Sequence, residues 1–84
     1  MTKRFAICDD VHVKPGEAFE WLNSTDKDCT ATKCKPPLEK NRYVVKKHST
    51  ELARAQKKIK PGDYEYDCEC NGKKGQPKII IGGA

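Results

Sequence analysis

The chain is poor in hydrophobic residues and has no long apolar run. Only 36% of its 84 residues are hydrophobic, and no purely apolar run is longer than four residues. A membrane-spanning helix needs about 20 apolar residues in succession, so the sequence predicts no such span. Lys3 and Arg4 give a basic start, but Asp9 and Asp10 arrive before any apolar h-region, and no signal peptide is visible.

Sequence signatures of catalysis are also missing. The chain shows no phosphate loop, no paired-carboxylate motif and no Ser-His-Asp arrangement with supporting context. Neither of its two histidines has an obvious catalytic partner. His12, between Val11 and Val13, is predicted to face outward from a strand, and His48 is predicted to lie in a turn. We therefore expect a protein that is not an enzyme.

The chain is rich in charged residues and in cysteine. It carries 17 Lys and Arg against 12 Asp and Glu, a formal net charge of +5, together with five cysteines. A chain of this length forms one domain, residues 1–84, with a modest core, and such small domains usually need disulfides, a metal or a partner. Disulfides would favour a periplasmic or secreted mature protein over a cytoplasmic one.

Closely spaced turn signals favour several short strands. The breaks fall at residues 15–16, 23–26, 36–37, 61–62 and 71–72, where Pro, Gly, Asn, Asp and Ser gather. The clearest strand pattern runs from residue 64 to 70. Tyr64, Tyr66, Cys68 and Cys70 alternate there with three acidic residues, which places the tyrosines and cysteines on one face.

Residues 50–59 permit two local structures. Leu52, Ala55 and Ile59 fall at helical spacing, a Ser or Thr can cap the start, and a Pro-Gly pair would stop the helix. The strand alternative places Ala53, Ala55 and Ile59 inward but leaves Lys57 among them. Local spacing alone favours the helix by a small margin.

The stretch from Ile59 to Cys68 resembles the cupredoxin segment that leads through Pro-Gly and Tyr-x-Tyr into the copper-binding cysteine. A ligand loop and a last apolar strand follow in that family, as residues 78–81 do here. Residues 11–23, ending in Trp21-Leu22-Asn23, resemble an earlier cupredoxin strand pair more weakly. The resemblance implies an all-β, Greek-key β-sandwich in which residues 50–59 are largely strand. We therefore expect that fold, with a short helix at 50–59 as an exception and Trp21 in the core.

The ligand positions depart from the family. The resemblance matches Cys68 to the copper cysteine and places Cys29 about where the first histidine would stand. Asn71 and Gly72 occupy the region of the second histidine, and Gln76 falls near the axial position. Because type 1 copper needs two imidazoles, the resemblance implies that this site is absent.

The cysteines leave three chemistries open. Disulfides are favoured, so that no cofactor is expected. A thiolate site for zinc or Cu(I), using Cys29, Cys68 and Cys70 with Cys34 as a further candidate, is the alternative, and plain buried thiols are the third. The resemblance would bring Cys29 close to Cys68. Cys8 is expected to be free, and Cys34, flanked by lysines, has the best local claim to a reactive thiol.

Basic residues are dispersed through the middle of the chain. They are Lys33, Lys35, Lys40, Arg42, Lys46, Lys47, Arg54, Lys57, Lys58 and Lys60. A solvated face is the favoured interpretation, and a face that binds an acidic protein partner is the functional one. Nucleic acid is not expected, because no stacking aromatics accompany the charges. The sequence thus predicts a cupredoxin-like interaction domain, with a thiolate metal protein and a basic adaptor as alternatives.

Overall fold

The computed structural model describes residues 2–83, and in that range it contains ten β-strands and no helix. The strands are β1 (Lys3–Ala6), β2 (Val11–Val13), β3 (Ala18–Asn23), β4 (Cys29–Thr32), β5 (Tyr43–Val45), β6 (Ser49–Arg54), β7 (Gly62–Glu65), β8 (Asp67–Cys70), β9 (Lys73–Gly75) and β10 (Lys78–Ile81). The predicted all-β class is confirmed.

A single long hairpin organises the C-terminal half. Its two arms, β7–β8 and β9–β10, turn back at Asn71 and Gly72, whose φ angles are 55° and 79°. Positive φ at both central residues is the conformation that Asn-Gly adopts most readily in a two-residue hairpin turn. Tyr66 interrupts the first arm, and its backbone N–H donates to the Pro77 carbonyl oxygen at 3.0 Å.

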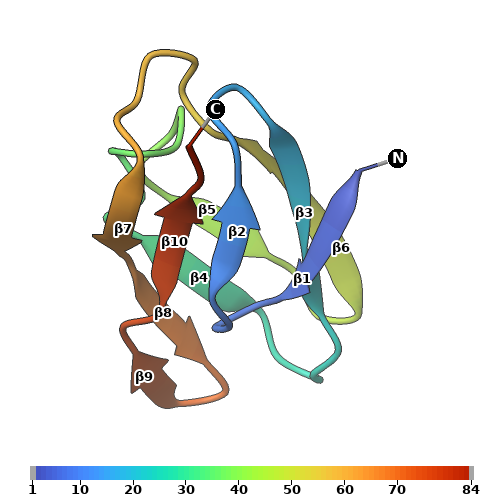
Figure 1. Ribbon diagram of the computed structural model, residues 1–84. Coiled ribbons are helices and arrows are strands. Elements are labelled where there is room, and N and C mark those ends of the chain that lie inside the picture. Colours follow the sequence, from blue (N-terminus) through green and yellow to red (C-terminus); the bar gives the residue numbers. More distant parts are fainter. Residues whose placement is uncertain (1, 84) are drawn as a thin grey trace.

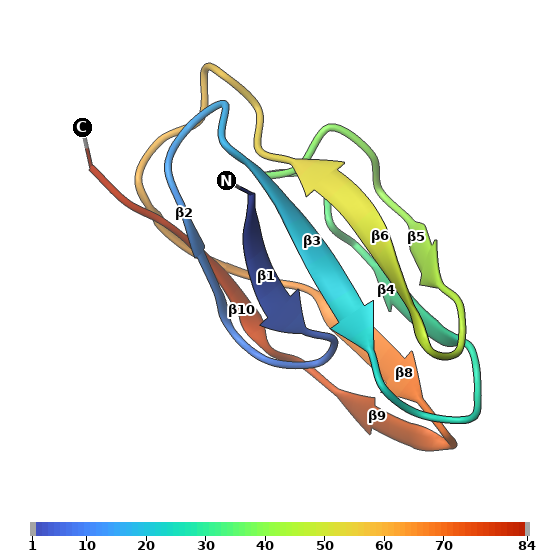
Figure 2. The ribbon, with the colours of Figure 1, turned by 90° about the vertical axis from the view of Figure 1, so that its right-hand side faces the viewer.

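The strands form two layers, and the long hairpin belongs to one of them (Figure 1, Figure 2). One layer is the sheet β1-β3-β6, in which β1 runs parallel to β3. The other contains the sheets β2-β10-β7 and β5-β4-β8-β9, which share the two arms of the hairpin. β2 joins β10 as a parallel partner, so the second strand of the chain lies beside its last strand. The result is a small β-sandwich.

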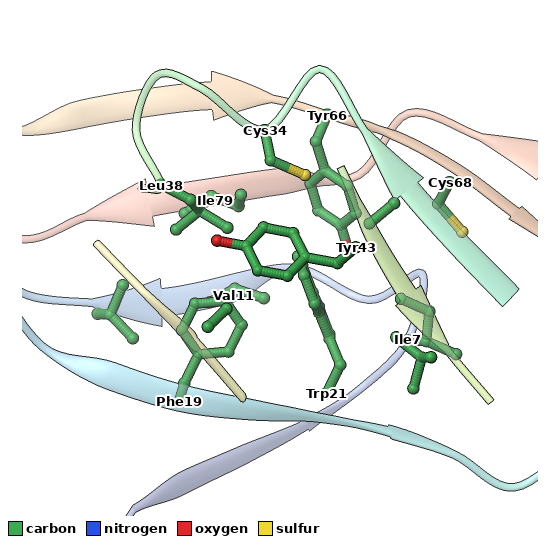
Figure 3. Close-up of a cluster of buried hydrophobic side chains, with 14 of the residues drawn as sticks. Ile7, Val11, Phe19, Trp21, Cys34, Leu38, Tyr43, Tyr66, Cys68 and Ile79 are labelled. Carbon is green, nitrogen blue, oxygen red and sulfur yellow. The ribbon is translucent and has the colours of Figure 1, made fainter. Parts of the chain in front are cut away.

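The core lies between these layers and is rich in aromatic side chains. Trp21, fully buried on β3, packs edge-on against Phe19 at 5.0 Å and Tyr43 at 5.4 Å between ring centroids, and it lies 5.4 Å from Tyr66 (Figure 3). Such tilted contacts are the favoured geometry for aromatic rings. The prediction that Trp21 is a core residue is confirmed.

The helical interpretation of residues 50–59 is wrong. β6 covers Ser49–Arg54 and pairs with all six residues of β3, and Ala55 forms a further bridge to Leu38. A helix would bury Leu52, whereas Leu52 is 57% exposed and Ala53 and Ala55 point inward. The strand alternative had placed Lys57 among inward-facing residues. The chain leaves the sheet before Lys57, and this lysine is exposed. Pairing with a long neighbouring strand overrides the weak local propensity.

Candidate functional site

Cys29 and Cys70 face each other across two neighbouring strands. Cys29 in β4 lies directly opposite Cys70 in β8, with their Cα atoms 4.4 Å apart, and the two form a disulfide. A Cα separation of about 4.5 Å is typical of antiparallel pairs whose side chains approach most closely. This bond therefore joins two strands that are already hydrogen-bonded to one another.

The second disulfide joins Cys68 to Cys8 and reaches across the molecule. Cys8 lies in the loop between β1 and β2 with a φ of 74°, and its Cα is 5.5 Å from that of Cys68. The bond connects positions 60 residues apart in sequence. Nearby, the Tyr66 hydroxyl donates to the Asp9 carbonyl oxygen at 2.9 Å. The N-terminal loop is thus held to β8 by both a covalent bond and a hydrogen bond.

Two sequence predictions about cysteine are corrected. The resemblance implied that Cys29 would meet Cys68, but the sheet register places Ala31 opposite Cys68 and Cys70 opposite Cys29. Cys8 was predicted to be free, and it is instead the partner of Cys68. The turn after β1 directs its side chain toward the hairpin.

Cys34 is the free cysteine of residues 2–83, and the prediction of a reactive thiol there is wrong. Its side chain is fully buried and lies beside Tyr66 (Figure 3). Burial raises the pKa of the Cys34 thiol to about 12, and the negative charge of Asp67 acts in the same direction. Because the thiolate is the nucleophile, a buried thiol of this kind is inert.

The predicted metal ligands Cys29, Cys68 and Cys70 are all consumed by the two disulfides. Within residues 2–83, no group of three or more His, Cys, Asp or Glu side chains is arranged to hold a metal ion. Gln76, near the predicted axial position, is exposed and donates to Asp67 at 3.3 Å. A thiolate site for zinc or Cu(I) stays a prediction for the protein with its disulfides reduced.

Both histidines lie where the sequence placed them. His12 is exposed on β2, and His48 is exposed in the turn that leads into β6, with a φ of 53°. The structure adds a partner for His48, whose Nε2 lies 2.7 Å from an oxygen of the exposed Asp26. The two histidines come from different strands and turns, and they share no site.

Asn23 anchors the loop that precedes Cys29. It is fully buried, and its side-chain amide donates to the carbonyl oxygens of Lys27 at 2.7 Å and Val45 at 2.8 Å. Its side-chain oxygen accepts from the backbone N–H of Thr25 at 2.9 Å. Buried amides require such partners, and here they fix the start of β4. We call the region around Cys8, Cys29, Cys68 and Cys70 the disulfide end.

A hollow lies on the outer face of β4, β8 and β9. It has a volume of about 560 Å³ and is lined by Thr30, Thr32, Asp67, Cys68, Glu69, Lys74, Gly75 and Gln76. Lys33 and Gln76 already engage Asp67, at 3.3 Å each. Six of the eight lining residues are polar or charged, whereas small-molecule sites are lined mainly by hydrophobic and aromatic side chains.

The basic residues separate into distinct regions. Three loops at one end are joined by backbone hydrogen bonds. Gly16 N–H donates to the Gln56 carbonyl oxygen at 3.1 Å, and Gln56 N–H donates to the Pro37 carbonyl oxygen at 2.8 Å. Figure 1 shows the β2–β3 and β6–β7 loops together at the end opposite the Asn71–Gly72 turn. We call the segments 14–17, 35–40 and 54–60 the basic end. Lys46 and Lys47 of the predicted basic face lie elsewhere, in the turn before β6.

The basic end carries the whole net charge of the protein. Its exposed basic side chains are Lys14, Lys35, Lys40, Arg54, Lys57, Lys58 and Lys60, against two acids, Glu17 and Glu39. The difference of +5 equals the formal net charge, because the ten other bases and ten other acids cancel. Within residues 2–83, none of these seven bases forms a salt bridge, and Glu17 is engaged by Lys3 of β1.

Comparison with known proteins identifies no relative. No protein-family model matches the chain, and neither a curated protein nor a solved structure matches it significantly. The residues described here include no helix long and apolar enough to cross a membrane.

Proposed function

We propose that this protein is a cupredoxin-like interaction domain without type 1 copper, which acts by binding a partner and not by catalysis. The observation that carries the proposal is that Cys68 and Cys29 both form disulfides. In the resemblance to cupredoxins, these two residues occupy the positions of two copper ligands. In this protein Cys68 is bonded to Cys8 and Cys29 is bonded to Cys70. A thiol oxidised in this way cannot supply the thiolate that a copper or zinc site requires.

The strand order supports the cupredoxin-like part of the proposal. Both layers contain neighbouring strands that are not consecutive in sequence, such as β3 and β6 in one layer and β4 and β8 in the other. Such crossovers between two packed sheets are typical of Greek-key sandwiches. The cysteine that follows the Tyr-x-Tyr segment lies on the strand before the last hairpin turn, where the family resemblance would place it.

The disulfides also support a proposed compartment. Two disulfides in a small domain with a thin hydrophobic core are typical of oxidising environments. We therefore propose a periplasmic or secreted protein in its mature form. The disulfides replace part of the stability that so short a chain cannot obtain from its core alone.

Mass spectrometry and metal analysis test the proposal. The protein is purified without reductant, its intact mass is measured, and zinc and copper are assayed; Cu(II) is then titrated while absorption is recorded. We expect a mass lower by four hydrogens for the two disulfides, no bound metal and no intense blue band. Stoichiometric zinc or copper with thiols that become free on chelation would establish the thiolate alternative instead.

A further inference from the structure

We propose that the open edge of β6, beside the basic end, binds an extended acidic segment of a partner protein as an added β-strand. The inference rests on the proposed function as an interaction domain and specifies the partner and the surface. Strand addition to an exposed sheet edge is a recurrent mode of peptide recognition, in which main-chain hydrogen bonds supply affinity and side chains supply specificity.

β6 is paired along its whole length with β3, and on its outer side, within residues 2–83, only its last residue has a backbone hydrogen-bond partner. β6 is the last strand of the sheet β1-β3-β6 (Figure 2). On its outer side the Arg54 carbonyl oxygen accepts from Glu39 N–H at 3.0 Å. Successive residues of a strand direct their backbone groups to opposite sides, so Leu52 and Thr50 share the outward direction of Arg54. Within residues 2–83, no backbone hydrogen bond from beyond the β3 ladder reaches Leu52.

An exposed apolar side chain marks this edge. Leu52 is 57% exposed and is the exposed large hydrophobic residue of the described chain. A hollow of about 160 Å³ separates Leu52 and Arg54 from the segment that contains Lys40 and Tyr43. It has room for about one side chain. An added strand would thus cover Leu52 and place one apolar side chain in this hollow.

Charge complementarity determines the kind of strand. Two cations, Lys40 and Arg54, and one acid, Glu39, line the hollow. Two further cations, Lys57 and Lys58, follow within four residues of the end of β6. These exposed cations belong to the basic end, whose net charge is +5. A segment that alternates acidic and apolar residues would meet the cations with one face and Leu52 with the other.

Other anionic partners fit this surface less well. Binding of single-stranded nucleic acid uses exposed aromatic rings for stacking, but the six aromatic residues of this chain are buried or partly buried in its core. A membrane surface would require an apolar face beneath the cations, and Leu52 stands alone. Both classes serve as competitors in the test.

The experiment measures binding of a fluorescent peptide of alternating glutamate and valine to the full chain. Lys57→Glu with Lys58→Glu is the test variant, and Lys73→Glu with Lys74→Glu on β9 is its control. Both pairs are consecutive and exposed, and both variants change the net charge equally. We expect the test variant to weaken binding about tenfold and the control to leave it unchanged. Equal weakening by both would overturn a located site.

Amide hydrogen exchange separates strand addition from simple charge attraction. On binding, the amides of Thr50 and Leu52 should gain protection, and Leu52→Asn should weaken binding about fivefold through lost apolar contact. Protection on β9, or tighter binding of an oligonucleotide or a phosphatidylserine vesicle, would overturn the inference. If the peptide fails to bind, the docking inference falls, whereas the proposed function is judged separately by the mass and copper measurements.

Discussion

The two ends of the sandwich are stabilised in different ways. At the disulfide end, two covalent bonds and the buried amide of Asn23 hold loops that come from four parts of the chain. At the basic end, three loops that carry seven basic side chains are joined without a disulfide, by backbone hydrogen bonds and by the side chains of Arg54 and Gln56. Like charges at close range oppose folding. The disulfides at one end therefore help to offset the unbalanced charge at the other.

The disulfide that joins Cys8 to Cys68 should show the largest effect. Replacing both residues by alanine removes a cross-link between positions 60 residues apart, and we expect the free energy of unfolding to fall by about 4 kcal/mol. Denaturant unfolding of the double variant measures this change. The double alanine variant of Cys29 and Cys70 is the control, and a fall of under about 1 kcal/mol in both would contradict the contrast between the ends.

Removing either of two tyrosine hydroxyls should change the free energy of unfolding by an intermediate amount. Tyr66 donates to Asp9 at the disulfide end in a partly buried bond, and Tyr64 donates to Lys60 at the basic end in an exposed one. Tyr66→Phe should cost about 1 kcal/mol because it leaves a partly buried carbonyl without its donor, and Tyr64→Phe should cost less. Thermal unfolding of both variants checks the order, and the reverse order would break the comparison.

Glu17 should give the smallest effect and a dependence on pH. The Lys14 backbone N–H, at 2.9 Å, holds the pKa of Glu17 below its usual value of 4.5, and Lys3 acts in the same direction. A lowered pKa in the folded state stabilises the protein above pH 4.5, and this contribution disappears as the pH falls through the folded-state pKa.

Glu17→Gln should therefore lower the free energy of unfolding by roughly 0.5 kcal/mol at neutral pH and by less in acid. Glu39→Gln is the matched control, since Glu39 is the other acid of the basic end and is exposed. Denaturant unfolding at several pH values measures both variants. A deficit for Glu17→Gln that persists unchanged below its folded-state pKa would contradict this origin.

Much of the fold follows from short patterns in the sequence. The Asn71-Gly72 pair predicted a break between strands, and the structure shows a hairpin turn there, because few other residue pairs adopt positive φ twice in succession. The alternation from Tyr64 to Cys70 predicted which face of β7 and β8 is buried, and the burial of Tyr66 and Cys68 confirms it. Local spacing favoured a helix at residues 50–59, and this prediction was wrong. The spacing of apolar residues in a short segment contains no information about pairing with β3.

The cysteine pairing depended on contacts that no local pattern contains. Even with five cysteines and a disulfide framework expected, the partners are set by strand register and by the direction of a loop. Cys70 pairs with Cys29 because β8 and β4 align at those positions, and Cys8 pairs with Cys68 because its turn faces the hairpin. A one-residue shift of register would have directed these side chains to the opposite face.

The sequence by itself determined the all-β class, the turns, the inward position of Trp21 and the excess of basic residues, because each depends on composition or on neighbours along the chain. Tertiary structure alone decided the disulfide partners, the burial of Cys34 and the gathering of the net charge into three loops at one end. These features arise where segments distant in sequence meet. Their geometry is fixed by strand pairing between the two layers, which the order of residues does not display.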